Sequence, residues 1–285
     1  MAKSSAVTST VLEFDMDALR RREQEVANES DEQIMERLDD RFLTLKEMTN
    51  AVKAGTVRAM IVSGPPGVGK SYGVEEVLIG HGLLDTLAER KQKYEIVKGA
   101  MSALGLYMKL YEFHKQGNVV VFDDCDDVLF DALSLNLLKG ALDSGKRREI
   151  SWNLDSRILR SEGIPNSFDF QGSAIFITNI KFHLVKSKTL RQHLDALESR
   201  CHYIDLQMDT NREKILRIRQ VVGQGMLSDR DMDDEAVAEV LDFVEIYQDD
   251  LRELSLRMVI KIADLRKSFP LKWEATARQT CMRRA

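Results

Sequence analysis

Short runs of apolar residues recur along the chain up to about residue 206, and longer stretches with helical spacing separate them. The runs are Ala59–Val62, Tyr94–Val97, Val119–Phe122, Ala174–Ile177 and His202–Leu206. Four of these runs are apolar enough to be strands buried on both faces, as in a parallel sheet covered by helices. The alternation predicts an α/β doubly wound domain that ends at about residue 208.

Helical patterns without strands flank this domain on both sides. Before it, Asp15–Met48 is charged and periodic, whereas residues 1–10 resemble a loose tail. After it come three stretches with helical character, namely Asn211–Val222, Asp233–Tyr247 and Asp249–Ser268. We therefore expect a tail and helical segment over residues 1–48, a core over 49–208, a small all-helical domain over 209–268 and a C-terminal tail over 269–285.

Composition indicates a soluble globular protein with room for one or two domains, since 44% of its 285 residues are hydrophobic and 31% are charged. The net charge is 41 − 46 = −5, so any nucleic-acid contact has to be local. No apolar run approaches the ~18 residues that cross a bilayer, and the first residues lack the apolar segment of a signal peptide. Cys125, Cys201 and Cys281 show neither disulfide nor metal spacing. We expect a cytoplasmic protein without membrane contact.

One glycine-rich segment lies between the first apolar run and the helical stretch that follows it. It consists of Gly64, Pro65, Pro66, Gly67, Val68, Gly69, Lys70 and Ser71. Glycines in such a loop let backbone N–H groups point at phosphate oxygens, and the N-terminus of the next helix favours the same negative charge. Lys70 would then neutralise the β- and γ-phosphates, and the Ser71 hydroxyl would bind Mg²⁺. The strand–loop–helix context favours a nucleotide site over a glycine-rich turn with an exposed lysine.

Two acidic residues follow the third apolar run directly. Because that run is a predicted buried strand, we expect Asp123 and Asp124 at the carboxyl edge of the sheet, beside the phosphate-binding loop. Asp123 is the predicted metal-side carboxylate, and Asp124 is the candidate for orienting the attacking water. Asp126 and Asp127 are expected only to cap a helix over Val128–Leu142.

A further polar position follows the fourth apolar run, which ends in Thr178 and Asn179. An amide there can hold the attacking water or touch the γ-phosphate, although an Asn at a strand end is more often a turn residue. Its place in the series, after the loop and the acidic pair, gives Asn179 its weight as a site residue.

The order of these parts resembles an AAA+ ATPase, a P-loop NTPase whose parallel sheet is followed by a small helical lid. Gly64–Ser71 resembles the Walker A motif, Val119–Asp124 resembles Walker B, and Asn179 resembles sensor 1. Leu197–Cys201 reads Leu-Glu-Ser-Arg-Cys and is similar to the segment with the family's arginine finger, in the spelling of clamp loaders. Leu254–Arg257 resembles sensor 2. The resemblance extends over about residues 40–268.

The resemblance implies ATP hydrolysis with Mg²⁺ in a homo-oligomeric ring. Arg200 would act in trans on the nucleotide of the neighbouring subunit, and Arg257 would reach the γ-phosphate from the lid. The alternative for Arg200 is an arginine at a helix end, where its charge is favourable to the helix dipole. The alternative for Arg257 is an ordinary solvated charge on a helix.

The acidic pair departs from the family pattern, whose Walker B motif usually ends Asp-Glu. Asp124 is one methylene shorter than Glu, which changes the distance from its carboxylate to the attacking water. Slow turnover is one expected consequence. An Asp-Asp ending, a proline-bearing phosphate loop and a Thr-Asn third motif are similar to viral superfamily III helicases, whereas a helical lid favours the wider AAA+ class. The compact chain also suits a phage-encoded protein.

Gly145–Arg160, between the helix at Val128–Leu142 and the strand at Ala174, carries a net charge of +5 − 2 = +3. Its cations are Lys146, Arg147, Arg148, Arg157 and Arg160. Residues 148–154 and 168–172 alternate enough to be two strands, similar to the hairpin with which some AAA+ members grip DNA in a ring channel. The alternatives are a solvated loop and arginines at a subunit interface.

Three outputs therefore remain open: a DNA-directed motor or loader, a protein-remodelling chaperone, and a slow ATP-gated scaffold. A protein partner would be gripped by Lys98–Ser102 at the end of the second apolar run. Unfolding members of the family usually carry an aromatic residue there, and Met101 is a poor substitute.

Overall fold

The computed structural model describes residues 16–87, 92–182 and 185–283. The loose tail expected over residues 1–10 lies outside the described residues. The chain divides into two compact units. Of the described residues, the first unit contains Arg41–Gly64 and Lys70–Leu206, and the second contains Met16–Asp40, Pro65–Gly69 and Gln207–Ala285.

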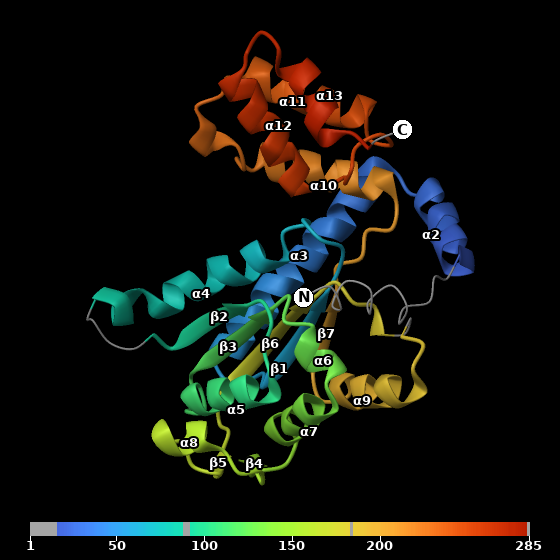
Figure 1. Cartoon of the computed structure of the whole chain (residues 1–285). Helices are drawn as coiled ribbons and strands as arrows, with labels where there is room; N and C mark the ends of the chain where they lie inside the picture. The colour runs from blue at the N-terminus through green and yellow to red at the C-terminus, as the bar shows by residue number, and fades with distance from the viewer. Residues whose placement is uncertain (1–15, 88–91, 183–184, 284–285) are drawn as a thin grey trace. The chain divides into compact units, whose positions relative to one another are not determined.

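A parallel sheet forms the centre of the first unit (Figure 1). Its strands, within the described residues, are β1 (Ala59–Ser63), β2 (Tyr94–Lys98), β3 (Val119–Asp123), β6 (Ser173–Thr178) and β7 (His202–Asp205), in the spatial order β2-β3-β6-β1-β7. Every neighbouring pair is parallel. Each strand lies on one of the five apolar runs, so the predicted α/β architecture with a parallel sheet is confirmed.

Helices cover both faces of the sheet, which explains the continuous apolar character of its inner strands. β1, β3 and β6 are buried along their whole length. On one face, Ile61, Phe122 and Phe176 pack in a core to which α5 (Ala103–Glu112), α6 (Asp127–Phe130), α7 (Ala132–Ala141) and α9 (Lys188–Glu198) contribute. The other face is covered by α4 (Lys70–Leu87) (Figure 1). An ion pair of 2.9 Å between Lys46 and Glu76 joins α4 to the C-terminal part of α3 (Asp31–Lys53).

An insertion between α7 and β6 forms a small antiparallel pair. It consists of β4 (Glu149–Ser151), the short helix α8 (Arg157–Ser161) and β5 (Ser167–Asp169). The Tyr107 ring of α5 has its centroid 5.6 Å from that of Trp152 and 5.1 Å from that of Phe168, so aromatic packing anchors the pair on the first unit. The two strands predicted over residues 148–154 and 168–172 are confirmed, and they are shorter than expected.

The second unit is helical in its described residues. It contains α2 (Met16–Asn28), the first part of α3, α10 (Asn211–Gly223), the 3-10 helix η2 (Ser228–Arg230), α11 (Asp234–Ile246), α12 (Leu256–Ser268) and α13 (Trp273–Cys281). Trp273 is buried, and its ring centroid lies 5.2 Å from that of Phe243, so α13 belongs to the core of this unit. Arg37 of α3 donates to the buried carboxylate of Glu213 in α10 at 3.1 Å. No described helix has the length and apolar character needed to cross a membrane.

One helix prediction is wrong, whereas the helical character predicted for Asp15–Met48 is confirmed in its described residues, as two helices. The helix expected over Val128–Leu142 is divided into α6 and α7 at Asp131, whose backbone is extended and whose carboxylate accepts from Ser134 N at 2.8 Å. The helical stretch Asp15–Met48 is likewise divided into α2 and α3, because Ser30 and Gln33 exchange side-chain to backbone hydrogen bonds at the start of α3.

The helix expected over Asp249–Ser268 begins later than predicted, at Leu256. Ser255 has an extended backbone, and its hydroxyl accepts from Met258 N at 3.2 Å as the N-cap. Just before it, Leu251 forms an isolated antiparallel bridge with Met282 near the end of the chain. Pairing with a distant segment therefore replaces the local helix.

Candidate functional site

The polar residues that end β1, β3 and β6 meet at the carboxyl edge of the sheet. In the register of the sheet, Ser63 of β1 lies opposite Thr178 of β6, and Asp123 of β3 lies opposite Ile177 of β6. Because the strands are parallel and adjacent, the residues that follow them emerge at the same edge. The side chains at the start of α4 lie against these strand ends.

Ser71 and Asp123 form the first contact at this edge. Ser71 lies in the first turn of α4, and its Oγ donates to Asp123 Oδ1 at 2.9 Å. The Asp123 side chain is only 6% exposed, so strand β3 fixes the carboxylate. Lys98 Nζ, from the end of β2, lies 3.4 Å from the second carboxylate oxygen, Oδ2. The carboxylate thus has a hydroxyl on one oxygen and an ammonium near the other.

Lys70, Asn179 and Asp124 form a second chain of hydrogen bonds beside the first. Lys70 is buried, and its Nζ donates to Gly64 O and to Asn179 Oδ1, each at 2.7 Å. Asn179 Nδ2 in turn donates to Asp124 Oδ1 at 3.0 Å. Asp124 has a left-handed backbone with φ 53°, and its N–H donates to Ile177 O, which turns its side chain from β3 toward Asn179.

The structure therefore brings Lys70, Ser71, Asp123, Asp124 and Asn179 together, as expected from the sequence. Carboxylate, hydroxyl and amide oxygens at one sheet edge are ligands for a hard cation, and the lysine supplies positive charge beside them. No group of three or more His, Cys, Asp or Glu residues in the described chain is arranged to hold a metal ion by itself.

Asp126 contradicts the role of a helix cap that the sequence predicts for it. It stands at the N-cap position of α6 but makes no capping hydrogen bond there. Its Oδ1 accepts instead from Thr178 Oγ1 at 2.7 Å, so it ties β6 to the segment after β3. Burial raises the pKa of Asp126 above its ordinary value, and the hydrogen bond from Thr178 opposes that rise. The hydrogen bond from Thr178 thus holds the Asp126 carboxylate at the carboxyl edge of the sheet.

Two cysteines near the strands, Cys125 and Cys201, have thiols that do not ionise readily. Burial, together with the charge of Asp123, raises the pKa of the Cys125 thiol to about 11. Burial raises the pKa of the Cys201 thiol to about 12. Both residues stay protonated at neutral pH and pack as small apolar side chains.

Pro65–Gly69 of the glycine-rich segment group with the second unit. Gly67 and Gly69 have φ +71° and +103°, in the region that favours glycine. Gly67 O accepts from Leu256 N at 2.9 Å, and a Cβ on Gly67 would lie 2.7 Å from Ser255 Cβ. The loop is therefore in close backbone contact with the start of α12, and only glycine fits at its centre.

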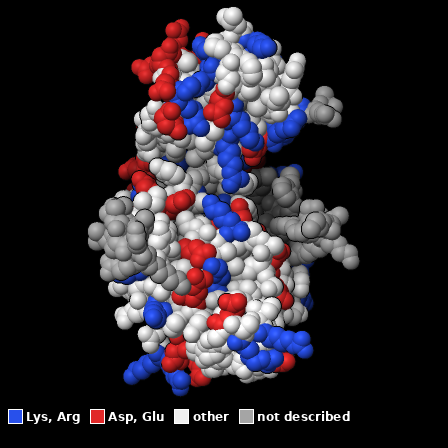
Figure 2. All heavy atoms as spheres, turned by 60° about the vertical axis from the view of Figure 1, so that its left-hand side comes forward, with Lys and Arg blue, Asp and Glu red and all other residues white. Residues whose placement is uncertain are grey.

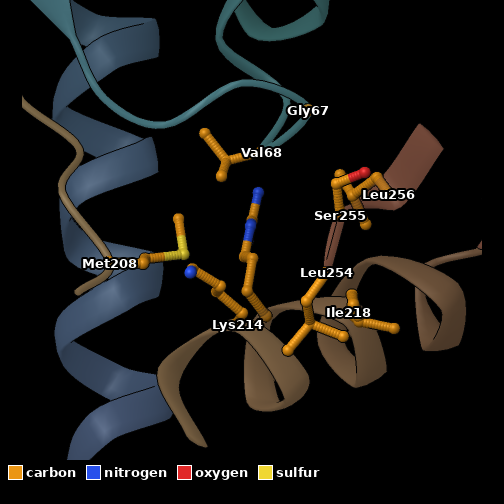
Figure 3. Close-up of a pocket in the computed structure, with 9 residues that line it drawn as sticks. Gly67, Val68, Met208, Lys214, Ile218, Leu254, Ser255 and Leu256 are labelled. Carbon is orange, nitrogen blue, oxygen red and sulfur yellow. The ribbon is translucent and has the colours of Figure 1, made fainter. Parts of the chain in front are cut away.

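A small hollow lies beside this loop, within the second unit (Figure 3). Its wall is mostly apolar, from Val68, Met208, Ile218 and Leu254, and two cations of α10, Lys214 and Arg217, also line it. Burial lowers the pKa of Arg217 to about 10, and Asp39 at 3.6 Å opposes the shift. The hollow combines an apolar wall with positive charge.

Arg257 and Arg200 occupy different places. Arg257 is exposed, and its Cγ would lie 3.6 Å from a Cβ on Gly67, so it stands beside the loop in the second unit. Arg200 precedes β7 and therefore lies at the amino edge of the sheet, where its Nη1 donates to Ala196 O at 2.6 Å and its Nε lies 3.9 Å from Asp143. The structure does not bring Arg200 to the carboxyl edge of its own sheet.

Three of the five cations in the basic insertion have partners within the chain. Arg147 donates to Asp169 at 2.9 Å, and Arg160 forms an ion pair with Asp155. Arg148 donates to Ala141 O and Gly172 O, each at 3.2 Å, and burial lowers its pKa to about 10. Lys146 and Arg157 are exposed. On the face drawn in Figure 2, acidic and basic side chains lie among each other and neither sign covers the surface.

Sequence reasoning missed Lys98 and Thr178 as members of the carboxyl-edge cluster. Both end a strand, as Asp123 does, and this position was the available signal. The sequence predicts Lys98 only as the start of the segment Lys98–Ser102 that would grip a protein partner, because the whole fold decides which strand lies beside β2.

Among known proteins, the chain is 33% identical over 256 residues to an uncharacterized 36.7 kDa protein from the nrdC-mobD intergenic region of Enterobacteria phage T4. The similarity covers 89% of this chain and 77% of the phage protein. The chain belongs to the family of this phage protein. No model of a known protein family matches it.

Proposed function

We propose that this protein binds and hydrolyses ATP in the manner of an AAA+ ATPase. The observation that carries the proposal is the pair of contacts at the carboxyl edge of the sheet, Ser71 with Asp123 and Lys70 with Asn179. Both begin at the glycine-rich segment, whose predicted task is to bind phosphates. The same edge supplies Asp124, so one cluster holds the groups that phosphoryl transfer needs.

The donor set fits Mg²⁺, because Ser71 Oγ and Asp123 Oδ1 are hard oxygen atoms 2.9 Å apart. Bound Mg²⁺ would neutralise charge that develops on the phosphates. Lys70 holds the β- and γ-phosphates, and the backbone amides of the loop orient them. Asp124, aligned by Asn179, orients the attacking water. These residues act by position and charge, which supply most of phosphoryl-transfer catalysis.

Arg257 stands next to Gly67 and is the proposed lid arginine for the γ-phosphate.

We further propose that Arg200 acts on the nucleotide of a second copy. It lies at the amino edge, and the five residues of β1 span about 16 Å from there to the carboxyl edge. That distance exceeds the reach of one arginine side chain. A homo-oligomer, such as a ring, is therefore required for Arg200 to take part in the reaction.

The proposed output is work on DNA, with Lys146 and Arg157 as the exposed cations of the insertion. A protein partner remains the alternative, and a slow ATP-gated scaffold is the other. The scaffold gains support from Asp124, because its short side chain already gives one oxygen to Asn179.

The first experiment measures binding of a fluorescent ATP analogue and the ATPase rate per subunit at increasing protein concentration, with and without DNA. We expect Lys70→Ala to lower both by at least about hundredfold, while Lys115→Ala, an exposed lysine before β3, changes neither. Nucleotide binding that survives Lys70→Ala would contradict the proposed site.

The same assay separates the oligomer and the output. A rate that rises with protein concentration and is lost in Arg200→Ala supports action in trans, whereas a concentration-independent rate that survives this change contradicts it. Stimulation by DNA that is lost in a Lys146→Ala/Arg157→Ala double variant supports a DNA motor. ATPase activity that needs Arg200 but ignores DNA assigns the output to a protein partner.

A further inference from the structure

Lys98 lies at the end of β2, directly beside the carboxylate to which the proposed function assigns the metal. The register pairs Lys98 with Asp123, and Lys98 Nζ lies 3.4 Å from Asp123 Oδ2. The other oxygen, Oδ1, accepts from Ser71 at 2.9 Å. The carboxylate that would bind Mg²⁺ is therefore already an ion-pair partner of a lysine of the same chain.

The two members of this ion pair are held with very different firmness. The Asp123 side chain is 6% exposed, whereas the Lys98 side chain is 62% exposed and carries its charge on a flexible four-carbon stem. The next residue, Gly99, has φ +95°, and nothing lies within 4 Å of the position of a Cβ. Lys98 is thus free to move its ammonium group while Asp123 stays in place.

A divalent cation and the Lys98 ammonium cannot both approach Asp123 without cost. Positive charges a few ångströms apart repel each other, and a carboxylate that is shared by two cations stabilises each of them less. The Asp123 carboxylate therefore stabilises either the ammonium group or the divalent cation fully, but not both.

We propose that Lys98 is an internal competitor for the metal, which neutralises Asp123 until Mg²⁺ and nucleotide bind and thereby weakens metal binding. This inference rests on the proposed function, because it requires a metal at Asp123. Its consequence is that the protein holds Mg²⁺ only together with phosphates, whose negative charge offsets the competition by Lys98. Lys98 is then a positioning residue of the site rather than a catalytic one.

The test is a titration with Mn²⁺ in the presence of ADP, in which electron paramagnetic resonance measures the concentration of free Mn²⁺. This measurement does not require ATP hydrolysis. We expect Lys98→Met to tighten Mn²⁺ binding about fivefold, the size that a single exposed ion pair accounts for. Lys98→Arg keeps the charge and should bind Mn²⁺ as the wild type does. Lys115→Met is the matched control, because it makes the same charge change before β3, at the other end of that strand.

Each outcome decides the inference. Tighter Mn²⁺ binding in Lys98→Met but not in Lys115→Met supports the competition, and a difference that shrinks in high salt supports its electrostatic origin. Equal or weaker Mn²⁺ binding in Lys98→Met overturns the inference alone, as long as the wild type binds Mn²⁺ with ADP. If the wild-type protein binds neither Mn²⁺ nor ADP, the proposed function is overturned as well. If Lys98→Met binds ADP more weakly than the wild type when EDTA removes the metal, Lys98 binds phosphate directly. That result would also overturn the inference of competition for the metal.

Discussion

At the carboxyl edge of the parallel sheet, most polar contacts join side chains to one another: Ser71 donates to Asp123, and Asn179 lies between Lys70 and Asp124. Lys70 also donates to one backbone carbonyl, that of Gly64. At the amino edge, the hydrogen bonds of three arginines go to backbone carbonyls. Arg58 donates to Asp143 O and Gly145 O, Arg148 to Ala141 O and Gly172 O, and Arg200 to Ala196 O.

The two kinds of contact differ in what a ligand could replace. Bonds between side chains on separate elements can be exchanged for bonds to a ligand while each helix and strand keeps its own backbone hydrogen bonds. Carbonyls at the ends of elements have no such alternative partner when they are covered, and leaving them unsatisfied costs free energy. We therefore expect changes at the carboxyl edge to alter activity at nearly constant stability, and changes at the amino edge to do the opposite.

The largest expected effect is a loss of stability from Gly172→Ala at the amino edge. A Cβ there would lie 2.1 Å from Phe113 O, so backbone has to move, and we expect the free energy of unfolding to fall by about 3 kcal/mol or more. Gly99→Ala at the carboxyl edge meets no atom within 4 Å and should cost only about 1–2 kcal/mol for its positive φ. Urea unfolding of a Trp273→Phe background, in which Trp152 alone reports on the first unit, measures both. Equal losses would break the comparison between the two edges.

The next effect is on turnover at the carboxyl edge. Asp124→Asn keeps the shape of the side chain and tolerates the left-handed backbone, so stability should change little. If Asp124 orients the attacking water, the ATPase rate constant should fall about hundredfold, with ATP affinity retained. Single-turnover hydrolysis measures this directly. An unchanged rate constant would assign the protein to the slow ATP-gated scaffolds.

Arg148→Ala tests the amino edge with a single side chain. It leaves Ala141 O and Gly172 O without their donor and removes packing over the Phe170 ring, so we expect a loss of about 2 kcal/mol in the free energy of unfolding. Arg147→Ala, which removes an exposed ion pair with Asp169, should cost at most about 0.5 kcal/mol. The same urea titrations compare the two, and similar losses would contradict the role given to backbone carbonyls.

The smallest effect concerns pH. Because burial raises the pKa of Asp126, the folded protein holds this proton more tightly, and the stability that protonation contributes is complete below 3.8 and is lost as the pH rises through the folded pKa. Asp126→Asn keeps an oxygen for Thr178 without the charge. We expect it to raise the free energy of unfolding at pH 7 by about 0.5 kcal/mol, and the gain should vanish toward pH 3.8. A gain that is constant with pH would exclude the titration of Asp126 as its cause.

Local sequence was sufficient wherever one physical requirement acted on neighbouring residues. The inner strands had to be apolar throughout, because helices cover both of their faces, and their runs marked β1, β3 and β6 within one residue at each end. The polar residues directly after such strands were placed correctly at one edge. Asp131 and Ser255 show the limit, because each begins a helix inside a pattern that reads as continuous helix.

By itself, the sequence determined the strands, the glycine positions of the loop and five of the side chains that meet at the carboxyl edge, namely Lys70, Ser71, Asp123, Asp124 and Asn179. Periodicity and backbone conformation are local properties. The carboxyl ends of parallel strands lie at the same edge of a sheet, whatever the order of the strands. Only the tertiary structure decided that β2 neighbours β3, so that Lys98 faces Asp123, that Thr178 recruits Asp126, and that Arg148 holds distant carbonyls. These contacts join residues far apart in the chain, and they depend on which strands become neighbours, a choice made by packing of the whole core rather than by any one segment.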